Sequence, residues 1–319
     1  MQARLTPVAV VGAGALGCLF GGMLARAGAA VTLIGRATHV AAIRRDGLVL
    51  ESGGRKQTIP LAATEDMNAV RGAGLVLFCV KSLDTDAAAR AMAPYLSADA
   101  VVLSLQNGVD NVERIRAQVR MDVDREVFPG LVYEAAQMAG PGHVRRTGGS
   151  GVVIGELAAY RRADGANRAL LDAIAALFTG AGVQMRVSDE VEVDLWAKLV
   201  MNCAYNAISA LGGAAYGEMV ALAEIRALMG DAAREATAVA AAKGIRLPDN
   251  IVAAAIKLAD GMPMQISSTA QDIRRGRRTE IDHLNGYVVR AGEVLGIATP
   301  VNRALNALMK LLERRSASS

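Results

Sequence analysis

Residues 8–17 read Val8-Ala9-Val10-Val11-Gly12-Ala13-Gly14-Ala15-Leu16-Gly17, which joins a β-branched run to a glycine turn and an apolar helical pattern. Gly12 permits the tight turn, Gly14 lets a pyrophosphate approach the backbone, and Gly17 allows the helix to pack on the strand. The first helical N–H groups then present the positive end of the helix dipole to the phosphates. We therefore predict that a dinucleotide binds at Gly12, Ala13, Gly14, Ala15, Leu16 and Gly17. The alternative is a glycine turn with a purely structural role.

The segment from Leu5 to Ala25 carries no charged residue, so its hydropathy alone would indicate a signal peptide or a membrane helix. Its five glycines and β-branched start favour a strand, a turn and a helix over one continuous span. No other long apolar run occurs, and we predict a soluble, cytoplasmic protein. The cysteines lie far apart, which favours buried thiols over a disulfide framework or a zinc site; they are Cys18, Cys79 and Cys203.

Hydrophobic residues make up 52% of the 319 positions and aromatic residues only 3%, so the core must be built from aliphatic side chains. This composition is typical of helix-rich α/β proteins and excludes a disordered chain. The 35 basic and 31 acidic residues give a formal net charge of +4, which suits an anionic small ligand. The charge is too dilute to indicate nucleic-acid binding. The three histidines have no metal-ligand spacing, so no metal site is predicted.

Strand and helix patterns alternate through the first part of the chain, which predicts a parallel sheet covered by helices on both faces. The predicted strands are residues 8–11, 31–34, 75–80, 101–105, 127–133, 151–154 and 183–187, with a hairpin of 48–51 and 57–59. The predicted helices between them include 85–95, 109–119 and 167–178. After Ser188 only helical patterns remain, at 191–211, 219–243, 249–258, 269–275, 281–295 and 302–314. We predict an α/β protein with an N-terminal Rossmann-type domain (1–188) and a smaller all-α domain (189–319).

Polar residues follow the predicted parallel strands at the edge where open α/β sheets bind ligands. Arg36 ends the second strand, where enzymes that bind NAD usually have Asp or Glu. A guanidinium can bind a 2′-phosphate through two hydrogen bonds, so Arg36 predicts NADPH, with a solvated arginine as the alternative. Lys81 is placed to contact the ribose or nicotinamide side, and Asn107 to contact both cofactor and substrate. A simple turn before a helix explains Asn107 equally well.

A polar stripe interrupts an otherwise apolar helix in the second half. Lys198, Asn202 and Asn206 recur at i, i+4 and i+8, so they lie along one side of the helix. Buried amide and ammonium groups need partners, which the carboxylate and carbonyl of a ligand would supply. The alternative is a solvated face.

Two capping boxes are predicted further along this half. In the first, Ser268 is the N-cap and Gln271 follows three residues later, and residues 279–282 repeat the pattern. The first cap also makes Ser268 a candidate carboxylate site. Between the boxes, residues 274–278 contain four arginines, which are interpreted as a solvated loop because no nucleic-acid motif accompanies them.

Taken together, these residues resemble the ketopantoate reductase (2-dehydropantoate 2-reductase) family, which makes pantoate for pantothenate synthesis. The resemblance covers nearly the whole chain, and its most specific part is the block from Ser267 to Gly286. The other matching segments are residues 12–17, Val80-Lys81, Gln106-Asn107-Gly108, and Trp196-Ala197-Lys198-Leu199 with Asn202 and Asn206.

The resemblance implies roles for the matching positions. Lys198 looks like the family's general acid, and Glu280 matches a glutamate of the active-site cleft near the cofactor and the lysine. Cofactor contacts are implied for Arg36, Lys81, Asn107, Glu280 and, through its backbone at the nicotinamide, Ala136. Substrate contacts are implied for Asn107, Lys198, Asn202, Asn206 and Ser268.

Two departures from the family pattern affect the substrate pocket. Many members have an Asn-x-Ser-Ser-Met sequence, whereas this chain has Gln265 at the Asn position and Thr269 at the Met position. A second substrate asparagine is replaced by Tyr216. These changes leave the identity of the 2-keto acid open.

The resemblance implies NADPH-dependent reduction of ketopantoate to pantoate, with hydride delivered to C2 and an active site between the two domains. The expected partner is a small 2-keto acid, without nucleic acid or membrane, for a monomer or homodimer. Another 2-keto acid is one alternative. A second is a 3-hydroxyacid dehydrogenase of the 6-phosphogluconate type, in which Arg277 and Arg278 would meet a substrate phosphate. A non-enzyme alternative is a redox sensor that binds NADPH without turning it over.

Overall fold

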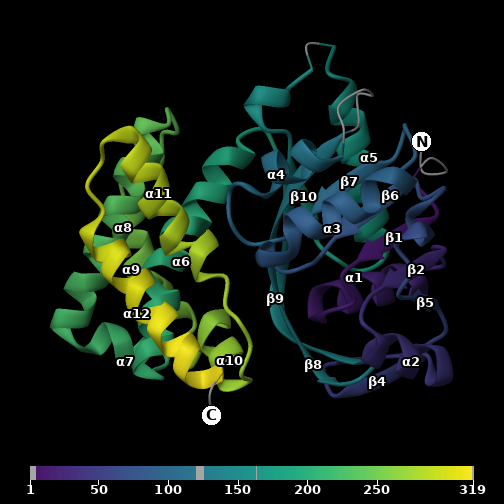
Figure 1. Cartoon of the computed structure of the whole chain (residues 1–319), viewed down its shortest axis with the longest axis horizontal. Coiled ribbons are helices and arrows are strands. Elements are labelled where there is room, and N and C mark those ends of the chain that lie inside the picture. Colours follow the sequence, from purple (N-terminus) through teal and green to yellow (C-terminus); the bar gives the residue numbers. More distant parts are fainter. Residues whose placement is uncertain (1–4, 120–125, 163, 318–319) are drawn as a thin grey trace. The chain divides into compact units, whose positions relative to one another are not determined.

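The computed structural model describes residues 5–119, 126–162 and 164–317 (Figure 1). The chain divides into two compact units by its internal contacts. Unit 1 comprises residues 1–106 and 110–191, and unit 2 comprises residues 107–109 and 192–319. The strands lie in unit 1, whereas unit 2 is helical, as the fold class predicted from the sequence requires.

Unit 1 is built on a sheet whose strands follow the order β4-β3-β9-β8-β7-β6-β1-β2-β5, with β10 beside β9. The run from β8 to β5 is parallel, and it forms the Rossmann-like part of the fold. Antiparallel pairing joins β3 to β4 and β8 to β9. The bounds are β1 Val8–Val11, β2 Val31–Ile34, β3 Leu48–Ser52, β4 Arg55–Ile59, β5 Ala62–Thr64, β6 Leu75–Phe78, β7 Val101–Ser104, β8 Val127–Gly140, β9 His143–Gly155 and β10 Met185–Ser188.

The uncharged segment near the N-terminus forms β1, the glycine turn and helix α1 (Ala15–Arg26). Helix α1 packs against β1 and β2 and also against β3, β8 and β9. A Cβ on Gly21 would lie 2.7 Å from the Leu33 side chain, and one on Gly22 would lie 2.7 Å from the Leu48 side chain. The helix is apolar on several sides because strands approach it from several sides. Among the described residues, no helix has the length and apolar character needed to cross a membrane.

The remaining helices of unit 1 cover the sheet. They are α2 Ala37–Asp46, α3 Thr85–Met92, α4 Asn111–Gln118 and α5 Ala166–Gly180, with short 3₁₀ turns η2 Met67–Val70, η3 Ser82–Asp84, η4 Ala93–Tyr95 and η5 Ala158–Tyr160. Helix α2 and strand β5 were not among the elements predicted from the sequence. Both are short, and α2 buries only Val40, Ala42 and Ile43.

The β8–β9 hairpin is much longer than the predicted strands 127–133 and 151–154, and Figure 1 shows it as a long curved ribbon. Its outer part lacks the apolar alternation on which strand prediction depends. There Arg146 donates two hydrogen bonds to the Glu134 carboxylate, at 2.7 and 2.9 Å, from the facing strand. Register shifts near Ala135 and Ala136 interrupt the regular pairing.

Unit 2 consists of helices packed around an aliphatic and alanine-rich core (Figure 1). Its elements are α6 Val191–Gly212, α7 Tyr216–Ala221, α8 Ala223–Ala242, α9 Ile251–Gly261, α10 Ser268–Arg274, η6 Ile281–His283, α11 Asn285–Leu295 and α12 Pro300–Ala317. The predicted helix 219–243 is divided, because Leu222 is extended between α7 and α8 (φ −88°, ψ 122°). The predicted helix 281–295 is a 3₁₀ turn followed by α11.

Candidate functional site

The glycine turn after β1 is held by backbone contacts that leave no room for side chains at two positions. Gly12 has φ +108°, and a Cβ there would lie 2.7 Å from the backbone of Cys79 and Val80. A Cβ on Gly17 would overlap the carbonyl oxygen of Gly12. The Gly12 and Ala13 N–H groups donate to the Ile34 carbonyl at 2.9 and 3.0 Å, which ties the turn to the end of β2. These glycines are required by packing.

Gly14 differs from its neighbours because a Cβ there would meet no atom within 4 Å. It is the N-cap of α1, and neither a capping side chain nor an acidic first-turn residue occupies this helix end. The N–H groups of the first turn have no acceptor within the helix. This open backbone, with the positive end of the helix dipole, fits a pyrophosphate.

Two basic residues lie at the same carboxyl edge of the sheet as the glycine turn. Arg36 is exposed, follows β2 and is the N-cap of α2. Within the described part of the chain, its guanidinium forms no hydrogen bond or ion pair. Lys81 is half-buried and follows β6 as the N-cap of η3. The parallel strands therefore place both cations at the edge predicted from the sequence.

Gln106 braces this edge, a role that sequence reasoning missed. Its Nε2 donates to the Val80 carbonyl at 3.0 Å and to Thr85 Oγ1 at 2.7 Å. Ser104 Oγ donates to Gln106 Oε1 at 2.9 Å. The side chain is buried, so these bonds hold the segment that carries Lys81 firmly against β7. The only signal in the sequence was an amide side chain between a buried strand and Asn107.

Ala136 lies in β8, half-buried, at the register shift beside Ala135. It faces Arg146 of β9, whose guanidinium binds Glu134. The shift leaves irregular backbone at this point of the strand.

Lys198 lies on α6, half-buried among apolar neighbours that include Trp196 and Leu199. Burial lowers the pKa of the Lys198 ammonium to about 8, and the negative charge of Glu280 acts in the opposite direction. Burial disfavours the charged form, whereas a nearby carboxylate favours it. The net effect is a pKa well below that of an ordinary lysine.

Glu280 and Asn107 complete this cluster, and all three residues belong to unit 2. The Glu280 side chain is buried, and Asn107 Nδ2 donates to its Oε2 at 3.4 Å. An acid of moderate pKa, a buried carboxylate and an amide are a combination suited to proton transfer at a polar ligand.

Asn202 and Asn206 continue the stripe along α6, Asn202 half-buried and Asn206 buried. The backbone of this helix is tied to the start of α10: Ser267 Oγ donates to the Asn206 carbonyl at 3.2 Å, and the Ser267 N–H donates to Ser209 Oγ at 3.3 Å.

The predicted capping box at Ser268 is wrong by one residue. Ser267 is the N-cap of α10, and its Oγ accepts from the Ala270 N–H at 3.0 Å. Gln271 donates instead to the Ile266 carbonyl at 3.2 Å. Ser268 is the first residue of the helix and is exposed.

The second predicted box is wrong as well. Thr279 Oγ1 accepts from the Ile281 N–H at 3.3 Å, which is a local turn, and no side chain caps η6.

The two departures from the family pattern are neighbours. The Tyr216 N–H donates to the Gln265 carbonyl at 2.9 Å, although the two residues are 49 positions apart along the chain. The Tyr216 ring packs on Tyr205 with 4.3 Å between centroids, and burial raises the pKa of the Tyr216 phenol to about 12. Gln265 Nε2 donates to the adjacent Ile266 carbonyl.

The arginines of residues 274–278 are exposed. Arg274 donates to the Gly213 carbonyl at 3.0 Å.

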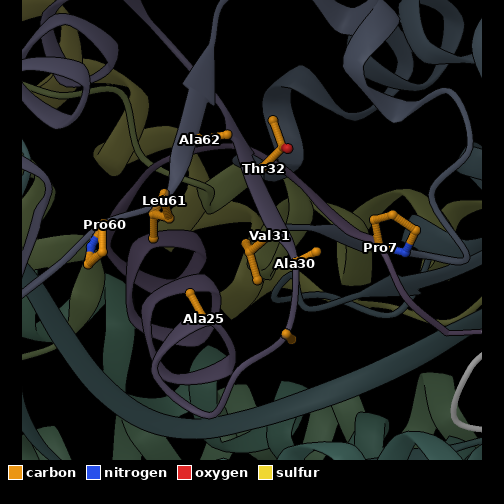
Figure 2. Close-up of a pocket in the computed structure, with 9 residues that line it drawn as sticks. Pro7, Ala25, Ala30, Val31, Thr32, Pro60, Leu61 and Ala62 are labelled. Atoms are coloured by element: carbon orange, nitrogen blue, oxygen red, sulfur yellow. The ribbon is translucent and has the colours of Figure 1, made fainter.

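A pocket of about 430 Å³ lies elsewhere in unit 1 (Figure 2). It is lined by Pro7, Ala25, Val31, Pro60 and Leu61, among others, most of them apolar. Pro7 precedes β1 and Val31 begins β2, so the pocket is at the amino edge of the strands, opposite the glycine turn. It lacks groups for acid–base chemistry.

Comparison with known proteins gives a consistent result. The family model described as "Ketopantoate reductase PanE/ApbA" matches residues 8–159, and the one described as its C-terminal part matches residues 190–313. A 2-dehydropantoate 2-reductase of Halobacterium salinarum is 36% identical over 310 residues, which cover 96% of this chain and 99% of that protein.

Solved structures agree. A PanE/ApbA family ketopantoate reductase from Ralstonia eutropha JMP134 is 49% identical with a TM-score of 0.87, covering 97% of this chain and 99% of that one. A D-mandelate dehydrogenase solved with NADH and anilino(oxo)acetate is 26% identical with a TM-score of 0.88, with coverage of 97% and 99%.

Proposed function

The chain belongs to the ketopantoate reductase family, and on this premise we propose that it reduces ketopantoate to pantoate with NADPH. The product would enter pantothenate and coenzyme A synthesis in the cytoplasm. Residues 1–188 would form the NADP-binding domain and residues 189–319 the substrate and catalytic domain, in a monomer or homodimer.

The observation that carries this proposal is the cluster of Lys198, Glu280 and Asn107. A lysine with a pKa of about 8 is largely protonated at neutral pH, so its ammonium can polarise a carbonyl and donate a proton to the developing alkoxide. The buried Glu280 carboxylate keeps that ammonium charged and holds Asn107. We assign Lys198 as the general acid and Glu280 as its partner.

The residues around this cluster would position the substrate. Asn107, Asn202 and Asn206 offer amides for the carbonyl and hydroxyl oxygens. Ser268, exposed at the start of α10, is proposed to meet the carboxylate or the hydroxyl.

The cofactor residues of unit 1 fit NADPH. The open backbone at Gly14 would hold the pyrophosphate, and the exposed guanidinium of Arg36 would bind the 2′-phosphate. Lys81, Asn107, Glu280 and the backbone of Ala136 would contact the ribose and nicotinamide. The nicotinamide supplies hydride when bound, and the protein provides geometry and the proton.

A second 2-keto acid is the alternative substrate. It is favoured by Tyr216 and Gln265, which lie side by side and replace two amide-bearing positions of the family pattern. The similarity to a D-mandelate dehydrogenase is compatible with a less polar substrate side chain.

The test is NADPH oxidation by the purified protein with ketopantoate, 2-ketoisovalerate and benzoylformate, beside the Lys198→Ala variant. We expect turnover to be fastest with ketopantoate and to fall by about 10²–10⁴-fold in the variant. Turnover fastest with benzoylformate would favour the alternative substrate. Absence of turnover with all three acids, despite NADPH binding, would contradict the proposed function and favour the dehydrogenase or sensor alternatives.

A further inference from the structure

The segment that carries Glu280 is held on both sides by helix α12. The Thr279 N–H, one residue before Glu280, donates to Glu313 Oε1 at 2.6 Å. Two residues after Glu280, the Asp282 carboxylate accepts from Lys310 Nζ at 2.9 Å. The Glu313 contact is short and charge-assisted, which places it among the stronger hydrogen bonds of a protein.

The same face of α12 also reaches the lysine helix. Asn302, about three turns before Glu313, accepts a hydrogen bond from Asn285 Nδ2 at 2.9 Å. The Asn285 Nδ2 also donates to the carbonyl of Cys203, on α6, at 3.1 Å. Asn302 and Asn285 are fully buried, and Glu235 accepts from Asn302 Nδ2 at 2.8 Å. Helix α12 therefore contacts the carriers of both Glu280 and Lys198.

Glu313 occupies an unfavourable place for a carboxylate. It lies near the C-terminal end of α12, where the helix dipole is negative and cations are preferred, as at Arg314 and Arg315. The half-buried Glu313 offsets this cost by bonding to the Thr279 N–H, which has no sequence-local partner. Helix stability alone does not account for an acid at this position.

We propose that Glu313 is a positioning residue, which fixes Thr279 and thereby holds the Glu280 carboxylate toward the Lys198 ammonium. This inference rests on the proposed function of Lys198 and Glu280. If Thr279 is released, the Glu280 carboxylate moves away from the ammonium. The proton on Lys198 is then held less tightly, so its pKa falls further below that of an ordinary lysine.

Other charged and titratable groups of this segment and its neighbouring helices must be kept unchanged in the test. They are Asp282 and His283 in η6, Lys310 on α12, Arg278 before Thr279, and Lys198 on α6. Removing Glu313 also removes one negative charge from unit 2, and this change of charge must be kept apart from the loss of the Thr279 contact. A matched pair of variants separates that effect from positioning.

The experiment compares Glu313→Ala with Glu313→Gln in the full-length protein. Both remove the charge, but glutamine keeps an oxygen that can accept from the Thr279 N–H. We expect Glu313→Ala to lower kcat by about 10–100-fold and to move the alkaline fall of kcat/KM to lower pH. Glu313→Gln should recover most of kcat and shift that limb much less. The proposed phosphate contacts of the glycine turn and Arg36 are untouched, so the NADPH Kd should change much less than kcat in both variants.

Glu293→Ala is the control, because it removes an exposed carboxylate that pairs with Arg303 and should leave kcat and the pH profile unchanged. A titration of the Lys198 side chain by NMR in wild type and both variants gives a readout without substrate. This titration separates the positioning role of Glu313 from the proposed function. If the protein reduces no 2-keto acid, the proposed function fails, but the Lys198 pKa values of the two variants still decide the positioning role. Equal Lys198 pKa values in Glu313→Ala and Glu313→Gln, or a lowered melting temperature with an unchanged pH profile, would overturn the inference.

Discussion

The glycine turn allows a cofactor-binding role to be separated from a packing role by two matched substitutions. Gly14→Ala and Gly17→Ala each add one methyl group within the same turn and helix. At Gly14 the backbone is extended (φ −87°, ψ −164°), and the added Cβ meets no atom within 4 Å. At Gly17 the added Cβ overlaps the Gly12 carbonyl oxygen and lies 3.0 Å from the Val10 side chain.

The expected magnitudes follow from these surroundings. Gly14→Ala should change the free energy of unfolding by less than about 0.5–1 kcal/mol, since neither strain nor overlap is introduced. Its methyl group occupies the space that a pyrophosphate needs. Loss of one charged hydrogen bond, about 1.5–3 kcal/mol, corresponds to an increase in the NADPH Kd of about 10–150-fold. Gly17→Ala should destabilise the protein by about 1–3 kcal/mol through overpacking.

The assay is a fluorescence titration of NADPH together with a thermal melt for each variant. Gly14→Ala should bind NADPH weakly with a nearly unchanged Tm, whereas Gly17→Ala should melt lower by about 2–4 °C for each kcal/mol lost. A wild-type Kd for Gly14→Ala would refute the assignment of the pyrophosphate to this turn. A lowered Tm for Gly14→Ala would refute the claim that its surroundings are open.

Three further outcomes are expected. Arg36→Ala should weaken NADPH by about 1.5–3 kcal/mol while sparing NADH, and a wild-type preference for NADH would contradict the assignment. The kcat/KM for reduction should fall as pH rises through about 8, because the ammonium form of Lys198 is the acid, and a rate that rises there would contradict this role. Ketopantoate should be preferred over 2-ketoisovalerate in kcat/KM, but by less than about 10⁴–10⁵-fold, because Gln265 and Tyr216 alter the amides that would bind the ketopantoate hydroxyl. Equal kcat/KM values would exclude pantoate synthesis.

The parallel sheet and the strand–turn–helix at its start could be predicted because their signals are mostly local. The β-branched run of β1 ends in a turn whose glycines are dictated by contacts within a few residues and with Cys79 and Val80, directly after β6. The outer β8–β9 hairpin was missed for the opposite reason. Its pairing depends on Glu134 and Arg146, which meet only after the chain has folded back, and neither residue has a strong strand signal.

The candidate site residues on α6 could be predicted in part, because their spacing is a local signal. Helical spacing identifies Lys198, Asn202 and Asn206, but a site role for Glu280 follows only from the family resemblance. Gln106 belongs to a matching segment, yet the hydrogen bonds of its side chain were not predicted. The capping error has a physical cause. Both Ser267 and Ser268 can begin a helix, and the choice is made by Ser209, which accepts from the Ser267 N–H across 58 positions of sequence. No local pattern contains that information.

This division between local and distant determinants also bears on specificity. The glycine turn that we propose binds the cofactor is one short segment, so substitutions there are expected to act directly on binding. The acid cluster instead depends on residue 107, helix α6, the segment around Glu280 and, through Glu313, helix α12. On the proposed mechanism, a change in any of these segments would alter the distance between the Glu280 carboxylate and the Lys198 ammonium, and with it the Lys198 pKa. If the proposal holds, substrate choice and pH dependence can vary through residues that touch no ligand, such as Glu313.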